Sequence, residues 1–538
     1  MFRPALVVVA LAVATRAASG QAGPGPGSVG GRAEVFAGGE LENYLRYLQT
    51  LGEVAPYPWG LRAFAPAEVD RLLPVDTAHP WAAHYDLKPR VTHGPSVDWV
   101  APSASARLNS AFPFGYNDGP IWAGKGVTLA AQAGVAVRWG PLSLTVAPMA
   151  FVTQNAAFPL MNNGQTGAGA YMDGVQPGAI DLPQRFGNTA YKRLDPGQST
   201  ARLDWGGLAV GFSTANQYWG PATTFPMILG NNAAGFPHAF AGTAHPVDLW
   251  LLRLHARFIW GRLSQTAFSP ETASAGARYA TAVDVNLTSR FVPGFELGVI
   301  RFSHQPWPAG GLRPSDLLHV LRYEERANEA GTSHDYQLAS VYFRWVLPHS
   351  GFEVYGEYGR EDYNLNLRDY LEEPDHVGGY TIGIRKAVRR AGDRLLAVRA
   401  EVQNTQIGAL AQGRGVPAFY IHEGSPEQGH TQLGKVLGSA AGRGGAGSVV
   451  AVDAYSPQGR WTVSWTRMLR LQQADSAGVA TPGTRGLDVQ HELAVERLAF
   501  LGRYDLLAHL GLVYEFNRDF RGDAVDLNLI LGVRYGLP

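Results

Sequence analysis

The sequence predicts a transmembrane β-barrel of about eighteen antiparallel strands, preceded by a small periplasmic α-helical bundle. Two observations carry most of this prediction. From about Pro102 to the end of the 538-residue chain, apolar side chains recur at every second position. Short Gly/Pro turns also alternate with long polar loops. In addition, charged residues make up only 17% of a chain that contains 65 glycines, which suggests that part of the surface faces something other than water.

The start of the chain has the pattern of a secretory signal. Arg3 precedes the apolar stretch Pro4–Ala14, and small residues follow as far as Gly20. We therefore assign residues 1–20 to a cleaved signal peptide, with cleavage near Gln21. Beyond it there is no stretch of about 18 apolar residues that would predict a transmembrane helix. The chain contains 0 Cys, which excludes disulfides, thiolate metal sites and cysteine nucleophiles.

Residues 21–102 are predicted to form the helical bundle. Between Glu40 and Leu51, apolar residues recur at spacings of three and four and so share one helical face. A second helix is expected from Pro66, where proline occupies the first turn, and a third from His79 to Asp86.

Residues 103–538 are predicted to form the barrel. Near the end of the chain, Leu506, Leu510 and Phe516 fall on one face of a strand, whereas His509 and Glu515 fall on the other. The strands of a soluble β-sandwich would also alternate apolar and polar residues, so alternation alone does not distinguish it from a membrane barrel. The lengths of the connections distinguish the two. Long loops are expected at 154–199, 218–235, 305–334, 362–378 and 405–448, with short turns between them. If short turns and long loops alternate, the segment contains about eighteen strands, from Ser103–Phe112 to Ala524–Tyr535. With an even number of strands, the first strand begins and the last strand ends on the periplasmic side.

Inward-facing charges are expected to fill a polar lumen. They include Glu353, Arg385, Glu401 and Asp453, and we interpret most of them as structural ion pairs across the barrel interior. Lys+Arg and Asp+Glu are balanced at 45 each, so nucleic-acid binding is not expected. There is no Gly-x-Ser-x-Gly or His-Glu-x-x-His motif, and the His residues lack metal-ligand spacing. We therefore expect no enzyme activity, no cofactor and no metal.

The run from Gln217 to His238 does not fit strand or helix periodicity. Its Gly and Pro residues fix turns, its paired amides Asn231 and Asn232 donate and accept hydrogen bonds, and Trp219 offers a flat apolar face. Strand parity places its first part on the extracellular side, where such chemistry suits sugar binding. The alternative is a rigid loop that folds inward and shapes the mouth of the pore.

This run resembles the capsule assembly protein Wzi family of Gram-negative outer membranes. The resemblance rests on Trp219–Pro221 and Leu229–His238, and it extends to Arg360–His376, to Gly429–Gly438 and to the helical start. It implies an eighteen-stranded barrel that acts as a lectin and holds capsular polysaccharide on the cell surface. Many barrels end on an aromatic residue, whereas here Gly536–Pro538 follow Tyr535.

We therefore expect an outer-membrane protein that binds extracellular polysaccharide non-covalently through surface loops, and that helps to assemble and retain it. The alternative is a porin for small solutes, since a barrel of this size is wide enough for an aqueous path unless something blocks it. The expected partners are capsular polysaccharide, outer-membrane lipid and the barrel assembly machinery, and the protein is expected to be a monomer. The candidate polysaccharide-binding residues are Trp219, Asn231, Asn232, His238, Asp362, Arg368, Asp369, His376, His430 and Gln432.

Overall fold

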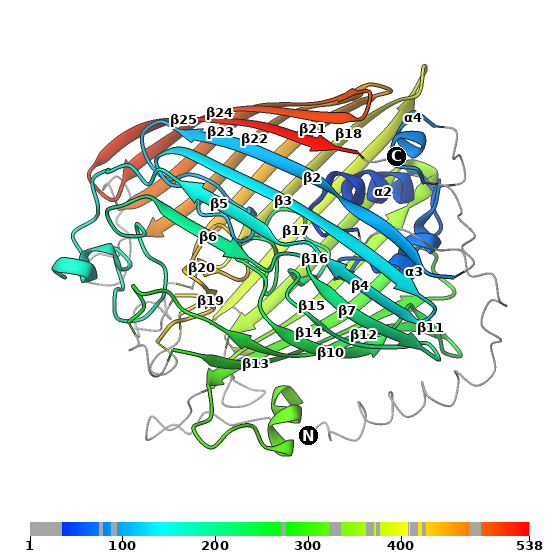
Figure 1. The fold of residues 1–538 in the computed structure, drawn as a ribbon, viewed down its shortest axis with the longest axis horizontal. Helices are drawn as coiled ribbons and strands as arrows, with labels where there is room; N and C mark the ends of the chain where they lie inside the picture. The colour runs from blue at the N-terminus through cyan, green and yellow to red at the C-terminus, as the bar shows by residue number, and fades with distance from the viewer. Residues whose placement is uncertain are drawn as a thin grey trace.

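A computed structural model provides the fold. It describes residues 35–74, 79–87, 94–270, 276–321, 335–361, 371–372, 377–406, 408, 418–421, 427–472 and 486–536. Most of these residues form one closed antiparallel barrel, whose strands run across Figure 1. Of the helices in the described ranges, none is both long and apolar enough to cross a bilayer.

The barrel is closed by pairing between β25 and β2. Three pairs of consecutive segments, β4 with β5, β6 with β7 and β10 with β11, each continue one span across a local break, so the described strands make eighteen spans. The strands are β2 (Ser96–Asn109), β3 (Gly126–Trp139), β4 (Leu142–Val146), β5 (Met149–Thr153), β6 (Tyr191–Asp195), β7 (Thr200–Trp205), β8 (Leu208–Ser213), β10 (His238–Thr243), β11 (Val247–Asp248), β12 (Leu252–Leu263), β13 (Arg278–Ser289), β14 (Phe295–Pro306), β15 (Tyr336–Leu347), β16 (Phe352–Glu361), β17 (Gly378–Arg390), β18 (Arg394–Asn404), β21 (Ala446–Ser456), β22 (Gly459–Gln472), β23 (Leu487–Leu501), β24 (Tyr504–Arg518) and β25 (Gly522–Tyr535).

The predicted alternation is confirmed on these strands. On β24, Leu510 and Phe516 are exposed on the outside, whereas Glu515 is fully buried on the inside. Large aromatic side chains are exposed at the ends of strands near the short turns, among them Trp99, Trp139 and Trp205. An apolar outer face with an aromatic girdle is the surface that a barrel presents to a bilayer.

The connections also follow the predicted pattern. At one end, tight turns such as Gly140–Pro141, Gly206–Gly207 and Gly502–Arg503 join the strands. Most connections at the other end are long, and the turn between β24 and β25 is a short exception. Since outer-membrane barrels have short periplasmic turns and longer extracellular loops, the long-loop end is extracellular. β2 begins at Ser96, so the first strand starts earlier than the predicted boundary at residue 103.

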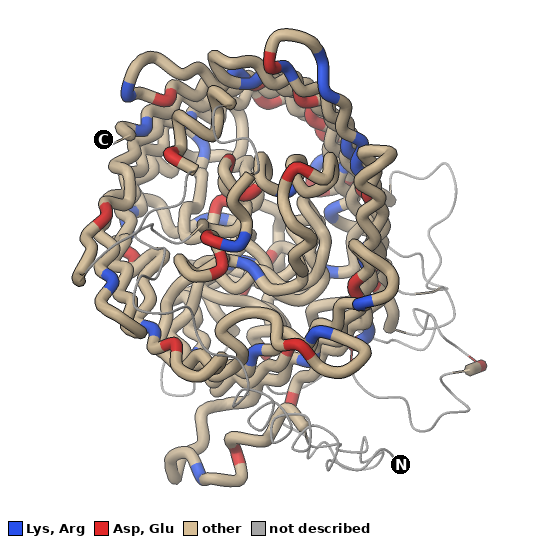
Figure 2. The backbone as a smooth tube through the Cα atoms, turned by 90° about the vertical axis from the view of Figure 1, so that its right-hand side faces the viewer, with Lys and Arg blue, Asp and Glu red and all other residues tan. Residues whose placement is uncertain are grey.

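The N-terminal helices lie inside the periplasmic mouth of the barrel. They are α2 (Glu40–Thr50), α3 (Pro66–Val69) and α4 (Pro80–His84), with a 3-10 turn, η2 (Asp70–Leu72), after α3. Figure 2 looks along the barrel from this end and shows chain filling much of the ring. The apolar face of α2, including Tyr44 and Leu48, packs in one cluster with Leu395 and Tyr455 of the inner wall. The helices therefore pack largely against the barrel wall.

Candidate functional site

The connection between β8 and β10, residues 214–237, folds into the lumen, and we call it the inner loop. Within it, β9 (Tyr218–Trp219) pairs with β1 (Leu61–Arg62) of the N-terminal segment. The guanidinium of Arg62 lies 3.8 Å from the centre of the Tyr218 ring, and the amide of Gly220 donates to the carbonyl of Gly60 at 2.8 Å. The inner loop and the N-terminal segment therefore meet as one packed unit inside the barrel.

Glu401 on β18 holds the inner loop from the wall. Its buried carboxylate accepts hydrogen bonds from the backbone amides of Thr223, Thr224 and Phe225 at 2.6, 2.9 and 2.6 Å. The hydroxyl of Tyr355 donates to the same group at 2.6 Å. Charge-assisted bonds of this kind are about twice as strong as neutral ones. Three successive amides on one carboxylate fix the path of the backbone.

An apolar core closes around the next part of the inner loop. Met227, Ile228 and Leu229 are buried together with inner-wall residues such as Ile259 and Phe302. Side chains from the connection between β18 and β21, including Phe419, Tyr420 and Leu437, complete this cluster. The loop is therefore held by burial of apolar surface as well as by polar anchors.

A second anchor joins α2 to the wall. Glu353 of β16 accepts from the Nε of Arg46 at 2.9 Å and from the hydroxyl of Thr50 at 3.1 Å. Arg344 of β15 lies 3.0 Å from the same carboxylate. Arg46 and Glu353 are 1% and 0% exposed. This is a fully buried network that requires both the N-terminal segment and the barrel wall.

Most of the described candidate residues are buried, so the expectation that these side chains are exposed is wrong. Trp219 is 0% exposed, His238 is 1% and Asn232 is 8%. The amide of Asn232 donates to the carbonyl of Val436 at 2.9 Å, and that of Asn231, which is partly buried, donates to the carbonyl of Ala37. Buried polar groups need partners, and here the loop backbone supplies them. The run from Gln217 to His238 therefore folds inward, as the alternative interpretation of the sequence expects.

His430 and Gln432 also lie inside the fold. The ring of His430 is 2.7 Å from the carbonyl oxygen of Ile228, and burial lowers the pKa of His430 to about 3, so the ring is neutral at pH 7. The carbonyl oxygen of Gln432 accepts from the amide of Ser264 at 2.7 Å. Both side chains join separate loops to one another. The remaining candidates, Asp362, Arg368, Asp369 and His376, lie outside the described residues.

The extracellular end carries an ordered loop that was predicted as a long connection but not as a site. Residues 154–190, between β5 and β6, contain the 3-10 helix η3 (Gly167–Tyr171), and we call this segment the cap. Asn163 donates to the carbonyls of Gly169 and Asp173 at 3.0 and 3.1 Å, and Asp173 forms a buried ion pair with Arg443. The cap is therefore tied down by internal polar contacts.

Several side chains on the cap point to solvent. Asn162, Gln165, Thr166 and Asn188 are exposed, and the partly buried ring of Tyr171 packs edge-on against Phe268. Amides and hydroxyls on an ordered backbone can hydrogen-bond to sugar hydroxyls, and an aromatic face can stack on a sugar ring. The one sequence signal for this surface is the amide-rich run Asn162–Gln165. Within the described part of the chain, no group of three His, Cys, Asp or Glu side chains is placed to hold a metal ion.

Comparisons place the chain among known barrels. The family model described as capsule assembly protein Wzi matches residues 113–460. No curated protein sequence matches the chain. Among solved structures, Wzi from Escherichia coli, described as an outer-membrane protein involved in group 1 capsule assembly and a carbohydrate-binding β-barrel, has 12% identity and a TM-score of 0.60, with 94% of this chain and 100% of that chain covered.

Two structures from Pseudomonas aeruginosa are more distant. OccK5 has 12% identity and a TM-score of 0.38, with 82% of this chain and 99% of that chain covered. OprD has 10% identity and a TM-score of 0.39, with 82% of this chain and 93% of that chain covered.

Proposed function

Because the chain belongs to the capsule assembly protein Wzi family, we propose that it binds an extracellular polysaccharide non-covalently and helps to assemble and retain that polysaccharide on the cell surface. The binding surface is the cap together with its neighbouring extracellular loops. The inner loop and the N-terminal segment have a different role, which is to fill and brace the lumen beneath that surface.

The observation that carries this proposal is the division between buried and exposed polar groups. Inside the barrel, the amide of Asn232 and the carboxylate of Glu401 already hydrogen-bond to groups within the chain. On the cap, the amides of Asn162 and Gln165 are exposed on a backbone that is itself held in place. The Asn162 oxygen accepts from the Gly164 amide at 3.0 Å, and its NH2 group is the donor that it offers to a ligand. A ligand that forms many hydrogen bonds gains most from donors and acceptors that are pre-ordered and not already used.

The same arrangement weighs against a porin for small solutes. The N-terminal segment occupies the periplasmic mouth, and the inner loop packs an apolar cluster against the inner wall. An open barrel of about this strand number has an aqueous channel. We expect the full-length protein in a planar bilayer to show no steady large conductance, and such a conductance would favour the porin.

The cellular test is deletion of the gene with capsule synthesis left intact. We expect polysaccharide to shift from the cell surface into the medium while the total amount stays unchanged. Unchanged retention would refute the proposed function. Total polysaccharide must be measured in the same cultures, because reduced synthesis would also lower the amount at the surface.

The molecular test compares an amide pair on the cap with a matched amide at the other end. Asn162→Ala with Gln165→Ala removes two exposed amides, and at about 1 kcal/mol per hydrogen bond we expect roughly tenfold or greater weakening of polysaccharide binding. Gln458→Ala removes an exposed amide from a periplasmic turn and should leave binding unchanged. Equal affinity of the cap variant and the wild type would exclude this part of the cap as the contact surface.

A further inference from the structure

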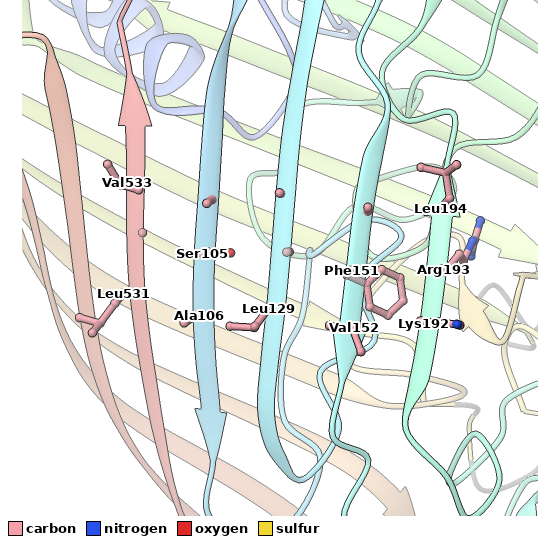
Figure 3. A pocket seen from close by; sticks show the side chains of 15 residues that line it. Ser105, Ala106, Leu129, Phe151, Val152, Lys192, Arg193, Leu194, Leu531 and Val533 are labelled. Carbon is pink, nitrogen blue, oxygen red and sulfur yellow. The ribbon is translucent and has the colours of Figure 1, made fainter.

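An apolar groove of about 1010 Å³ crosses the outer, lipid-facing wall (Figure 3). It spans β25, β2, β3, β5 and β6, far from the inner loop in the lumen. Its lining is apolar apart from Ser105, Lys192 and Arg193, and includes the alanines Ala104, Ala131 and Ala150.

Strand register explains the shape of the groove. Ala104, Ala131 and Ala150 are aligned across three neighbouring spans, and Val533 and Leu194 close the row at its two ends. All three alanines are exposed on the outside of the barrel. Methyl groups between larger flanking side chains leave a trough on a surface that elsewhere carries leucine and valine. Two rows nearer the extracellular end, Leu531, Leu129 and Val152 form one side of the trough.

The wall is also irregular immediately below the trough. The register between β2 and β3 shifts between Val100 and Ser103, the span of β4 and β5 breaks at Ala147–Pro148, and the span of β6 and β7 breaks at Pro196–Ser199. The regular pairing resumes along one row, Ser103, Gln132, Met149 and Asp195. Proline removes a ladder hydrogen bond, and a bulge bends its strand. Three neighbouring spans thus change course at one level, where the concave stretch of wall begins.

The groove lies at the level of the outer leaflet. Trp139 marks the periplasmic girdle at the end of β3, and Ala131 lies eight residues before it on the same strand, toward the extracellular side. With a rise of about 3.3 Å per residue and a strand tilt of about 40°, that places the alanine row roughly 20 Å above the girdle, in the upper part of an apolar band about 25 Å tall. Lys192 lies opposite Val152, two rows nearer the extracellular end than the alanines, and one residue from the extracellular end of β6. It is exposed and lies at the polar boundary of the apolar band.

We infer that the groove is a binding site for a phosphorylated, acylated glycolipid of the outer leaflet, with an acyl chain in the alanine trough and the lipid phosphate beside the ammonium group of Lys192. The exposed outer face of the groove has apolar walls and a single cationic group at the height of lipid headgroups. Arg193, which also lines the groove, is already paired with Asp195. A two-fold contact with a second copy would instead bring two Lys192 side chains to one patch, where like charges repel.

The test uses the full chain purified in detergent and stripped of lipid, with bis-phosphorylated lipid A and phosphatidylglycerol added separately and bound lipid counted by native mass spectrometry. Ala131→Leu with Ala150→Leu fills the trough, and Lys192→Gln removes the charge. The matched controls are Ala508→Leu, an exposed alanine of β24, and Lys386→Gln, an exposed lysine near the periplasmic end of β17. Because all of these side chains are exposed, the barrel should fold in each variant, which heat-modifiable migration checks.

We expect the wild type and both controls to retain one lipid A more tightly than phosphatidylglycerol. The leucine variant should bind lipid A about tenfold more weakly, and Lys192→Gln about fivefold more weakly, the effect of one lysine at an anionic lipid surface. Equal lipid A binding by all variants would overturn the inference. So would equal affinity for both lipids in the wild type, or conversion of a wild-type dimer into a monomer by the leucine variant, since a second copy would then occupy the groove.

Discussion

Glu353→Ala should detach α2 from the barrel wall. The Glu353 carboxylate accepts hydrogen bonds from Arg46 and Thr50 of α2 and forms an ion pair with Arg344 of the neighbouring strand. Arg46 and Glu353 are both almost wholly buried. After the substitution, two guanidinium groups remain in the interior without that partner. Their burial then opposes docking of the N-terminal segment rather than supporting it.

The magnitude follows from the burial. Removing one partner of a buried ion pair costs about 3–5 kcal/mol, and about 1.4 kcal/mol corresponds to a factor of ten in an equilibrium constant. The equilibrium between docked and undocked α2 should therefore shift by roughly two to three and a half orders of magnitude. The exposed pair Arg253–Asp248 is the matched control, because its side chains are 48% and 41% exposed and such pairs contribute about 1 kcal/mol or less.

Hydrogen exchange of the α2 amides measures this shift, because local opening sets their exchange rate. In Glu353→Ala, protection of Glu40–Thr50 should fall by roughly a hundredfold or more, while amides of β22–β25 keep theirs. Arg253→Ala should change neither set by more than about fivefold. If α2 protection in Glu353→Ala stays within that range in a folded barrel, the anchor does not hold the N-terminal segment and the reasoning is refuted.

Three further predictions concern the same interior. Glu401→Ala leaves the amides of residues 223–225 without their acceptor, so the inner loop should loosen and single-channel recordings should show openings that the wild type lacks; silent recordings would argue against this anchor. Burial alone would raise the pKa of Glu42, but Arg62 and the Gly38 amide lower it overall, so its stabilisation of the N-terminal segment is present above about pH 4.5 and is lost as the pH falls below that value. Pepsin cleavage within 35–74 should therefore rise in acid, and Glu42→Gln should remove this pH dependence; an unchanged acid profile would contradict the assignment. Trp219→Ala leaves a cavity in the buried core, so we expect about 3–5 kcal/mol of destabilisation by denaturant titration and little change in polysaccharide affinity; selective loss of affinity would return Trp219 to the binding surface.

The barrel could be predicted because the alternation of apolar and polar residues within each strand shows which of its side chains face the lipid and which face the lumen. In β24, the alternation of Leu510 and Phe516 with Glu515 needs no knowledge of the partner strands, and the structure confirms it. The length of each connection can also be read from the sequence alone, and it tells the periplasmic end of the barrel, with its short turns, from the extracellular end, with its long loops. The signal peptide and the residue limits of the domains stay predictions.

The position of the inner loop could not be settled in this way. Glycine, proline and asparagine fix turns equally well on a surface and in a lumen, so residues 217–238 were compatible with both. The decision depends on partners distant in sequence, such as Glu401 for the backbone of 223–225 and Arg62 for Tyr218. From the sequence, the paired amides are candidate sugar-binding groups or caps of turns, whereas in the structure Asn232 donates to the carbonyl of Val436, which lies some 200 residues away in the chain.

The charges on the inner wall explain why the lumen is filled. The sequence predicts that they pair with one another across the interior. In the structure, Glu353, Glu401 and Asp453 also bind groups on the inserted segments, namely Arg46, the amides of residues 223–225 and the hydroxyl of Tyr47. A wall with these carboxylates and no insert would leave charges to be solvated by water, as in a channel. With the insert they become buried anchors, which costs less free energy than leaving either side unpaired. The wall and the insert therefore depend on each other for stability, and we propose that polysaccharide binding falls to the extracellular cap, where amides such as those of Asn162 and Gln165 are exposed on an ordered backbone.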